Sequence, residues 1–454
     1  MITTNREDYK KDLEEVINVF TTVNNVEVTH RQKTDGRNFL DEFDVNGNLY
    51  SFKNTHNYND EIELKRLEKR FSKLGLYKIL TKIFNVTPPW GALTGIRPVK
   101  LAYTLKENFE SEFKEVFSVS NEKISLVKKI LSVQKNLVDI NNESCDFFIG
   151  IPFCPSRCAY CSFMSEEIGK SKNASAYVDA LVTEISETLK FTGKVRSVYI
   201  GGGTPVSLSV SDLEKILVAV SPIIKNNIEF TVEAGRPDCI TDEKLVLLKK
   251  YGVTRLCVNP QTFHDKTLKI IGRNHTVNDI FEKFELVKKH GFIINTDLIA
   301  GLNGETFEDF KYSIDTAIKL DAENITIHTL CLKKGSKLKE STNRLSEGEV
   351  YNMVEYAHQA LQNAGYNPYY LYRQKYTAGN LENTGYSKPN YECVYNANVM
   401  EEFSDNIACG ANAVSKRVFN ENNRIERYGS PKDILTYINK LPEIIKSKQE
   451  LYKR

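Results

Sequence analysis

The chain has 454 residues, which is too long for one ordinary hydrophobic core and predicts two or three domains. Apolar residues make up 41% and charged residues 26%, close to the averages of globular proteins, so we expect the chain to fold without a partner. Lys and Arg total 61 against 59 Asp and Glu, and this balance argues against nucleic acid as the main partner.

No apolar stretch approaches the length of a membrane span, and the first residues lack the apolar core of a signal peptide. We therefore expect a cytoplasmic protein without a membrane span. Nine cysteines in such a chain favour reduced thiols and metal binding over disulfides.

Residues 1 to about 135 are predicted to form a lysine-rich, mainly helical region with one β-hairpin. Two strand-like runs, 39–45 and 48–53, flank Asn46-Gly47, which is a typical two-residue turn. A segment rich in Pro and Gly follows over 88–98 and contains the only Trp of the sequence. We interpret this segment as a packed turn between helices rather than a ligand loop.

From about residue 145, short apolar runs alternate with amphipathic helical stretches. Six such strand–helix units in a row predict an α/β fold with a parallel sheet, and a six-stranded partial barrel fits at least as well as an open doubly wound sheet. The predicted strands are 147–152, 197–200, 228–232, 255–258, 293–298 and 324–329. The predicted helices between them are 175–189, 210–224, 242–251, 278–290 and 306–320.

One more helix is predicted over 347–363, followed by a mostly irregular, tyrosine-rich stretch through 400 and a charged tail. These changes of pattern predict three domains. They are an N-terminal α+β domain over 1–140, a partial barrel over 141–345 and a C-terminal domain over 346–454 that covers the barrel mouth.

The most specific motif is a trio of cysteines, Cys154, Cys158 and Cys161, with C-x3-C-x2-C spacing in the loop after the first predicted parallel strand. Three thiolates bind three irons of a four-iron, four-sulfur cluster and leave the fourth iron open. S-adenosylmethionine (SAM) fills such a position with its amino and carboxylate groups, and an electron from the cluster then releases a 5'-deoxyadenosyl radical. The alternatives are a zinc knuckle or three unrelated thiols, but the second pair of ligands that zinc sites usually have is missing.

Polar residues end or interrupt the next predicted strands, and in parallel β/α folds the ligand binds at the carboxyl ends of the strands. The run Gly201–Pro205 follows the second strand, where absent side chains would let backbone amides approach an amino-acid amine and carboxylate. Glu233, Gln261 and Asp297 belong to the third, fourth and fifth strand ends. Burying any of them without a partner would cost about 1 to 3 kcal/mol.

A shared polar ligand would supply these missing partners. Glu233 and Asp297 can accept hydrogen bonds from an ammonium group or from ribose hydroxyls, and Gln261 can bind ribose. Arg273 can pair with a carboxylate. A loop salt bridge explains any one of these residues equally well, but four together favour a binding site.

These motifs together resemble the radical SAM superfamily over about residues 145–335, and their order and spacing resemble its oxygen-independent coproporphyrinogen III oxidase-like branch. The flanking segments 89–98, 371–375 and 380–386 are similar to the coproporphyrinogen dehydrogenase HemZ subgroup. The resemblance implies a partial (β/α)6 barrel, with a [4Fe–4S] cluster on the three cysteines and an aromatic ring, that of Tyr160, packed on the adenine of SAM. The cofactor contacts that it implies are Tyr160, Gly202, Gly203, Thr204, Glu233, Gln261, Arg273 and Asp297.

By this resemblance the substrate is coproporphyrinogen III. The adenosyl radical removes a hydrogen from a propionate β-carbon, carbon dioxide leaves, and an external acceptor takes the remaining electron. Two such events give protoporphyrinogen IX in haem biosynthesis, with a reduced flavodoxin or ferredoxin-type protein as electron donor. Arg373, Lys375 and Arg97 are candidate cations for the substrate carboxylates, with ordinary surface placement as the alternative.

The sequence departs from the best-defined dehydrogenases of this branch in two places. It has Phe163 where they have a further cysteine, and Phe148 and Gly150 where they have Tyr and His. The alternatives are therefore a haem-binding or haem-trafficking protein, or a haem-modifying radical SAM enzyme of the same branch. A radical enzyme that modifies transfer RNA would need a basic appended domain, which the chain lacks. Three histidines expected near the site, His264, His275 and His328, are interpreted as satisfied loop or core imidazoles rather than haem ligands.

Overall fold

The computed structural model describes residues 2–20, 26–95, 97–161, 165–225, 227–331, 346–374, 377–422 and 424–453. The chain divides into two compact units. The first contains residues 1–128 and 373–381, and the second contains residues 129–372 and 382–454. The three-domain division expected from the sequence stays a prediction.

The first unit contains a four-stranded sheet with the order β1-β2-β3-β4. Its strands are β1 (Ile2–Thr4), β2 (Val28–Asp35), β3 (Asn38–Val45) and β4 (Asn48–Thr55). The predicted hairpin is confirmed, because β3 and β4 pair antiparallel around a turn in which Asn46 (φ 51°) and Gly47 (φ 84°) are both left-handed. Strands β1 and β2 were not expected from the sequence.

Helices account for most of the remaining N-terminal region. They are α1 (Lys10–Phe20), α2 (Glu61–Phe84), α3 (Pro98–Leu105), α4 (Phe109–Ser111) and α5 (Asn121–Gln134). Helix α2 begins where the Asp60 side chain accepts a hydrogen bond from the Glu63 N–H, and it ends at Asn85 in the left-handed conformation. Trp90 is only 1% exposed, as the interpretation of its segment as a packed turn requires.

The six predicted parallel strands are confirmed in the second unit. They are β5 (Cys145–Ile151), β8 (Val195–Gly202), β9 (Glu229–Glu233), β10 (Arg255–Cys257), β11 (Ile293–Ala300) and β12 (Asn324–Thr329). Each pairs in parallel with the next in this order. Their residues are almost continuously buried, because parallel strands are covered on both faces.

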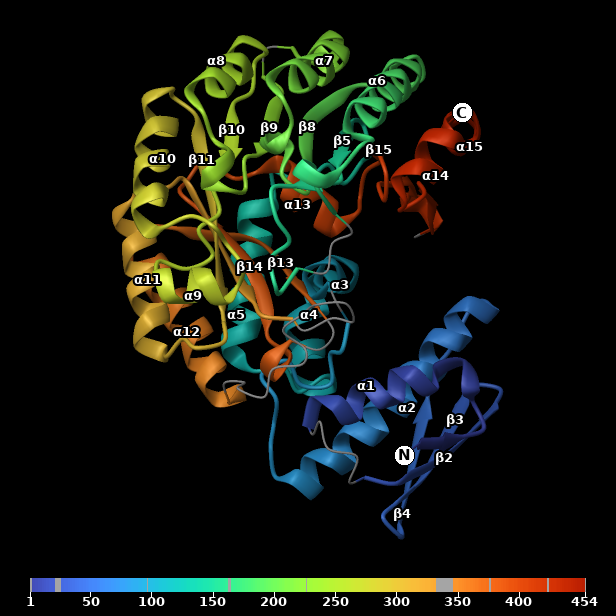
Figure 1. The fold of residues 1–454 in the computed structure, drawn as a ribbon. Coiled ribbons are helices and arrows are strands. Elements are labelled where there is room, and N and C mark those ends of the chain that lie inside the picture. The colour runs from blue at the N-terminus through green and yellow to red at the C-terminus, as the bar shows by residue number, and fades with distance from the viewer. Residues whose placement is uncertain are drawn as a thin grey trace. The chain divides into compact units, whose positions relative to one another are not determined.

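Helices follow the strands and lie along the outer side of the curved sheet (Figure 1). They are α6 (Ala174–Leu189), α7 (Val210–Val220), α8 (Asp242–Lys250), α9 (Asp265–Ile270), α10 (Val277–Lys289), α11 (Phe307–Lys319) and α12 (Glu347–Asn363). Helices α10 and α11 each begin with a capping box, at Thr276 and Thr306. Among the described helices, none combines the length and the apolar character that a membrane crossing needs.

The region after α12 is not irregular, and that prediction was wrong. It contains β13 (Asn367–Arg373), β14 (Glu382–Ser387), α13 (Val394–Glu401), β15 (Asn406–Cys409), β16 (Val414–Phe419), β17 (Arg424–Gly429), α14 (Ile434–Asn439) and α15 (Leu441–Tyr452). Strand β14 pairs antiparallel with β12, and β15 pairs parallel with β5. The result is an 11-stranded sheet with the order β13-β14-β12-β11-β10-β9-β8-β5-β15-β16-β17.

The physical reason for this error lies in the composition of the added strands. Strand β14 has the sequence Glu-Asn-Thr-Gly-Tyr-Ser, which has low intrinsic β-propensity, yet all six residues are buried. Pairing with β12 and burial on both faces, rather than local preference, make this segment a strand.

Candidate cofactor site at the ends of the parallel strands

The three predicted cluster cysteines lie in one loop at the carboxyl end of β5. Short strand β6 (Phe153–Cys154) pairs with β7 (Glu166–Glu167), and the Cys161 N–H donates to the Cys158 carbonyl at 3.1 Å. The Ala159 N–H donates to the Ile271 carbonyl at 2.9 Å, which ties the loop to the segment that carries Arg273. The three thiols are unbridged and only partly buried. The loop can therefore present all three sulfurs to one cofactor.

The donor set of this loop consists of three thiols, the ligand type that holds iron–sulfur clusters. In the described part of the chain, no three Cys, His, Asp or Glu side chains converge as ligands of one ion. A cluster does not require such convergence, because each thiolate binds a different iron. Two donors from outside the loop reach its sulfurs: Thr204 Oγ1 lies 3.6 Å from Cys154 Sγ, and Arg236 Nη1 lies 3.7 Å from Cys158 Sγ.

The glycine-rich run after β8 lies directly against the cysteine loop. The Gly203 N–H donates to the Ile151 carbonyl at 2.7 Å, and the Thr204 N–H donates to the Phe153 carbonyl at 2.6 Å. A Cβ atom at Gly203 would lie 2.3 Å from the Phe153 carbonyl oxygen, so no larger residue fits. These amides are already paired, which corrects the expectation that they would be open to a ligand. The glycine allows the close approach of β8 to the loop.

Glu233 is the last residue of β9 and is held at both carboxylate oxygens. Oε1 accepts a hydrogen bond from the Tyr199 hydroxyl at 2.7 Å, and Oε2 accepts one from the Gly202 N–H at 3.0 Å. Desolvation raises the pKa of Glu233 to about 7. A ligand ammonium group next to this carboxylate would favour its ionised form. The sequence reasoning did not identify Tyr199, although it lies two residues before the glycine run.

Gln261 and Asp297 are brought together by an extension of the pairing between β10 and β11. The Gln261 N–H donates to the Asp297 carbonyl at 2.9 Å. Gln261 has a left-handed backbone (φ 69°), and its buried Oε1 has no hydrogen-bond partner among the described residues. Such an orphaned oxygen fits a site built for a polar ligand.

Asp297 also belongs to a short chain of polar side chains. His328 Nε2 lies 3.5 Å from Asp297 Oδ2, and His328 Nδ1 lies 3.2 Å from the Tyr372 hydroxyl. His264 Nε2 lies 2.9 Å from the Asp309 carbonyl. His264 and His328 therefore have partners, as the interpretation from the sequence requires. Buried His275 does not fit that interpretation, because neither of its ring nitrogens has a hydrogen-bond partner among the described residues.

Arg273 and Tyr160 are in direct contact. Arg273 Nη2 donates to the Tyr160 hydroxyl at 3.2 Å, and Nη1 donates to the backbone carbonyl of Asn259. Arg273 is buried, and its Nε finds no partner among the described residues. The structure thus leaves one N–H of a buried guanidinium for a ligand, next to the aromatic ring that is expected to pack on adenine.

Of the two predicted substrate cations, the structure describes only Arg373. Arg373 is 6% exposed and lies in the first unit, where it donates to the carbonyls of Leu93 and Asn380 and lies over the Trp90 ring at 5.3 Å. Lys375 lies outside the described residues, as does Phe163. The substrate role of both cations stays a prediction.

The departures at Phe148 and Gly150 have a structural explanation. Phe148 stacks with Tyr199 and with Tyr395, at centroid distances of 6.3 and 6.2 Å. A Cβ atom at Gly150 would lie at van der Waals distance from the carbonyl oxygens of Cys409 and Ala411, at 3.4 and 3.5 Å. Gly150 therefore lies directly against the turn after β15.

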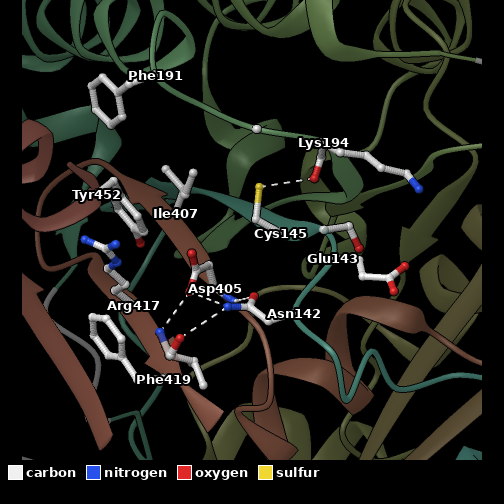
Figure 2. A pocket seen from close by; sticks show the side chains of 13 residues that line it. Asn142, Glu143, Cys145, Phe191, Lys194, Asp405, Ile407, Arg417, Phe419 and Tyr452 are labelled. Atoms are coloured by element: carbon white, nitrogen blue, oxygen red, sulfur yellow. Dashed lines mark hydrogen bonds between the residues drawn. The ribbon is translucent and has the colours of Figure 1, made fainter. Parts of the chain in front are cut away.

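A separate cavity of about 150 Å³ lies at the other end of β5, beside Cys145 (Figure 2). Arg417 lines it and donates to the carbonyls of Leu451 and Lys453, at 2.8 and 2.7 Å. None of the described residues predicted for cluster or SAM lines this cavity. We assign it no cofactor role, because ligands of parallel β/α folds bind at the opposite, carboxyl ends of the strands.

Comparisons with known proteins identify the family of this chain. The family model of the Radical SAM superfamily matches residues 148–317. The oxygen-independent coproporphyrinogen-III oxidase-like protein HemZ of Bacillus subtilis is 40% identical over 375 residues, which cover 78% of this chain and 75% of that protein. The heme chaperone HemW of the same organism is 40% identical over 192 residues, which cover 41% of this chain and 50% of that protein.

The fold is also similar to that of a solved structure. Coproporphyrinogen III oxidase (HemN) from Escherichia coli, described as a radical SAM enzyme, aligns with a TM-score of 0.55 and 19% identity, over 67% of this chain and 71% of that one. The fold and the cysteine loop thus define a radical SAM protein with the expected partial barrel, and its cofactors are a [4Fe–4S] cluster and SAM. The chain belongs to the family of oxygen-independent coproporphyrinogen-III oxidase-like proteins.

Proposed function

We propose that this protein catalyses the radical SAM oxidative decarboxylation of coproporphyrinogen III to protoporphyrinogen IX in anaerobic haem biosynthesis. The observation that carries the proposal is the extent of similarity to HemZ. It covers 78% of this chain, whereas the family model is confined to residues 148–317. The likeness therefore includes the flanking segments as well as the part of the barrel that binds the cofactors.

The residues at the strand ends have complementary roles in this proposal. Cys154, Cys158 and Cys161 hold the cluster. Bound SAM supplies, on reduction, a radical able to remove hydrogen from an unactivated carbon. The Glu233 carboxylate accepts a hydrogen bond from the ammonium group of SAM. The Gln261 side-chain oxygen, which has no partner among the described residues, accepts one from a ribose hydroxyl.

The remaining contacts fix the two ends of SAM. Asp297, which lies beside His328, accepts a hydrogen bond from the other ribose hydroxyl. Arg273 donates from its Nε–H to the SAM carboxylate. Tyr160, anchored by Arg273, packs on the adenine. Thr204 donates toward Cys154, and Gly202 and Gly203 let β8 approach the cysteine loop.

The substrate is a tetrapyrrole with four propionates, and the electron enters from a flavodoxin or ferredoxin-type donor. Arg373 and Lys375 are the proposed cations for the propionates. Because the Arg373 guanidinium also binds backbone carbonyls in the segment around Trp90, replacing it is expected to disturb that segment as well as substrate binding.

The test is an anaerobic assay with reconstituted protein, dithionite, SAM and coproporphyrinogen III. The expected products are 5'-deoxyadenosine, carbon dioxide and a tetrapyrrole lighter by two carboxyl groups and two hydrogens, identified by mass. The Cys158→Ala variant is the control and should form none of them. Stable haem binding by the wild-type protein without any turnover would contradict the proposal.

A haem-trafficking role is the second candidate. It is favoured by the 40% identity over 192 residues to the heme chaperone HemW. It is also favoured by Phe148 and Gly150, since the dehydrogenases that this chain resembles have Tyr and His there. Titration with haem, followed by its Soret absorption, would show saturable binding if this role holds. Absence of saturable binding, together with turnover, would eliminate it.

A further inference from the structure

A buried arginine that the proposed reaction does not use lies behind the cysteine loop. Arg236 follows Glu233 by three residues, and its side chain is only 3% exposed. A buried guanidinium is costly unless its N–H groups and its charge are matched by partners. The partners that this side chain has are therefore informative.

The guanidinium of Arg236 bridges a carboxylate and the cysteine loop. Nε and Nη2 donate to the two carboxylate oxygens of Asp238, both at 2.9 Å. Nη1 donates to the Ser156 hydroxyl at 3.1 Å and reaches Cys158 Sγ at 3.7 Å. The two-pronged pairing with Asp238 fixes the plane of the guanidinium, so that its remaining edge faces the loop. His275 Nδ1 lies 3.7 Å from Oδ1 of the same Asp238 carboxylate.

We propose that Arg236 is a positioning residue that orients Cys158 and raises the reduction potential of the cluster, with Asp238 holding it in place. The inference concerns the cofactor alone and does not depend on which tetrapyrrole is the substrate.

The physical reason is the charge of the cluster. With three thiolate ligands, the oxidised cluster carries one net negative charge and the reduced cluster two. A fixed cation at a ligand sulfur stabilises the reduced form more than the oxidised form, and a hydrogen bond to the sulfur acts in the same direction. Both effects are strong where water is excluded, as it is around Arg236.

Two further arginines lie near Arg236 in sequence or structure. Arg157 belongs to the cysteine loop itself, and buried Arg273 reaches the loop through Tyr160. Asp238 is the carboxylate that faces Arg236. Removing either partner of the pair should therefore change the potential, and the two changes should have opposite signs.

The test is a redox titration of the reconstituted 454-residue protein without substrate, followed by electron paramagnetic resonance of the reduced cluster. In Arg236→Gln the ratio of reduced to oxidised cluster, measured at a fixed solution potential, should fall about tenfold. For one electron this corresponds to a reduction potential lower by about 59 mV. Arg236→Lys keeps the charge and should recover most of this loss. The control is Arg196→Gln. Arg196 is partly buried, with 14% of its side chain exposed, and pairs with the Asp146 carboxylate, but it makes no contact with the described part of the loop.

A wild-type potential in Arg236→Gln with full cluster content would overturn the proposal, as would an equal shift in Arg196→Gln. If Arg236→Gln does not retain a cluster, the reduction potential of the Asp238→Asn variant tests the proposal instead. That variant keeps the arginine and removes the anion, so its potential should rise. An unchanged or lower potential in Asp238→Asn would then contradict the proposal.

Discussion

At the scale of single residues, the ends of the parallel strands combine buried polar groups with incomplete hydrogen bonding. Glu233 has partners for both oxygens, whereas Gln261 Oε1 and Arg273 Nε have none among the described residues. A polar ligand bound at the strand ends would complete the hydrogen bonding of both atoms.

SAM binding should depend on pH through Glu233. Burial raises the pKa of this carboxyl group to about 7, and an ammonium group favours the ionised form. The affinity for SAM should therefore be highest above about pH 7 and fall as the pH drops through this value. Isothermal titration calorimetry at about pH 6 and about pH 8 measures the effect.

The variant Glu233→Gln distinguishes the contribution of Glu233 to this pH dependence from that of other groups that titrate near pH 7. It should weaken SAM binding by about tenfold, or roughly 1.4 kcal/mol, and remove most of the pH dependence. Equal affinities of the wild-type protein at both pH values would show that Glu233 does not face the ammonium group.

The variant Gly203→Ala should displace the cysteine loop. Its Cβ would lie 2.3 Å from the Phe153 carbonyl oxygen, so the loop or the end of β8 must shift. We expect loss of at least about half of the bound iron and sulfide, measured per chain after reconstitution, with a normal circular dichroism spectrum. Gly169→Ala is the matched control, because no atom lies within 4 Å of the added Cβ. Full cluster content in Gly203→Ala would contradict this explanation of the glycine.

At the scale of elements, the C-terminal helix is attached to the barrel by a buried ion pair. Lys448 in α15 is fully buried, and its Nζ lies 3.0 Å from Glu184 Oε1 in α6 and 3.2 Å from Cys409 Sγ in β15. Glu184 also accepts hydrogen bonds from the Tyr437 hydroxyl and the Gly410 N–H. One carboxylate thus connects α6, α14, α15 and the end of β15.

Replacing Lys448 with alanine should lower the free energy of unfolding by about 3 to 5 kcal/mol, because the charge of Glu184 is then left uncompensated in the interior. Urea unfolding followed by circular dichroism measures this loss. Lys446→Ala on the exposed face of the same helix is the control and should change stability by less than about 0.5 kcal/mol. If the two variants are equally stable, the ion pair does not hold α15 in place.

At the scale of the whole molecule, the chain contains two units with separate cores. The only Trp of the sequence, Trp90, lies in the first unit, and the three cluster cysteines lie in the second. Trp fluorescence therefore reports on the first unit, and the absorption of a bound cluster reports on the second.

Unfolding by urea should give different midpoints for the two signals. Trp fluorescence should follow the first unit and cluster absorption the second, since domains with their own cores can unfold independently. The measurement is made anaerobically on the reconstituted protein, with circular dichroism as a signal common to both units. Coincident transitions for all three signals would mean that the chain unfolds as one cooperative unit.

The sequence alone determined the parallel strands, the helices between them and the cysteine trio. Strand and helix periods and close cysteine spacing are local properties, so they can be read from neighbouring residues. The sequence also placed Glu233, Gln261 and Asp297 at or near strand ends. In the structure Glu233 lies in β9 and Asp297 in β11, and Gln261 follows β10 and bridges to β11 at Leu298.

Only the tertiary structure decided which distant side chains meet. Arg236 reaches Cys158 across 78 residues of sequence, and Lys448 reaches Glu184 across 264. Strand β14 likewise forms only because β12 offers it a partner. These features depend on packing between segments far apart in the chain, and such contacts leave no periodic signal in either segment.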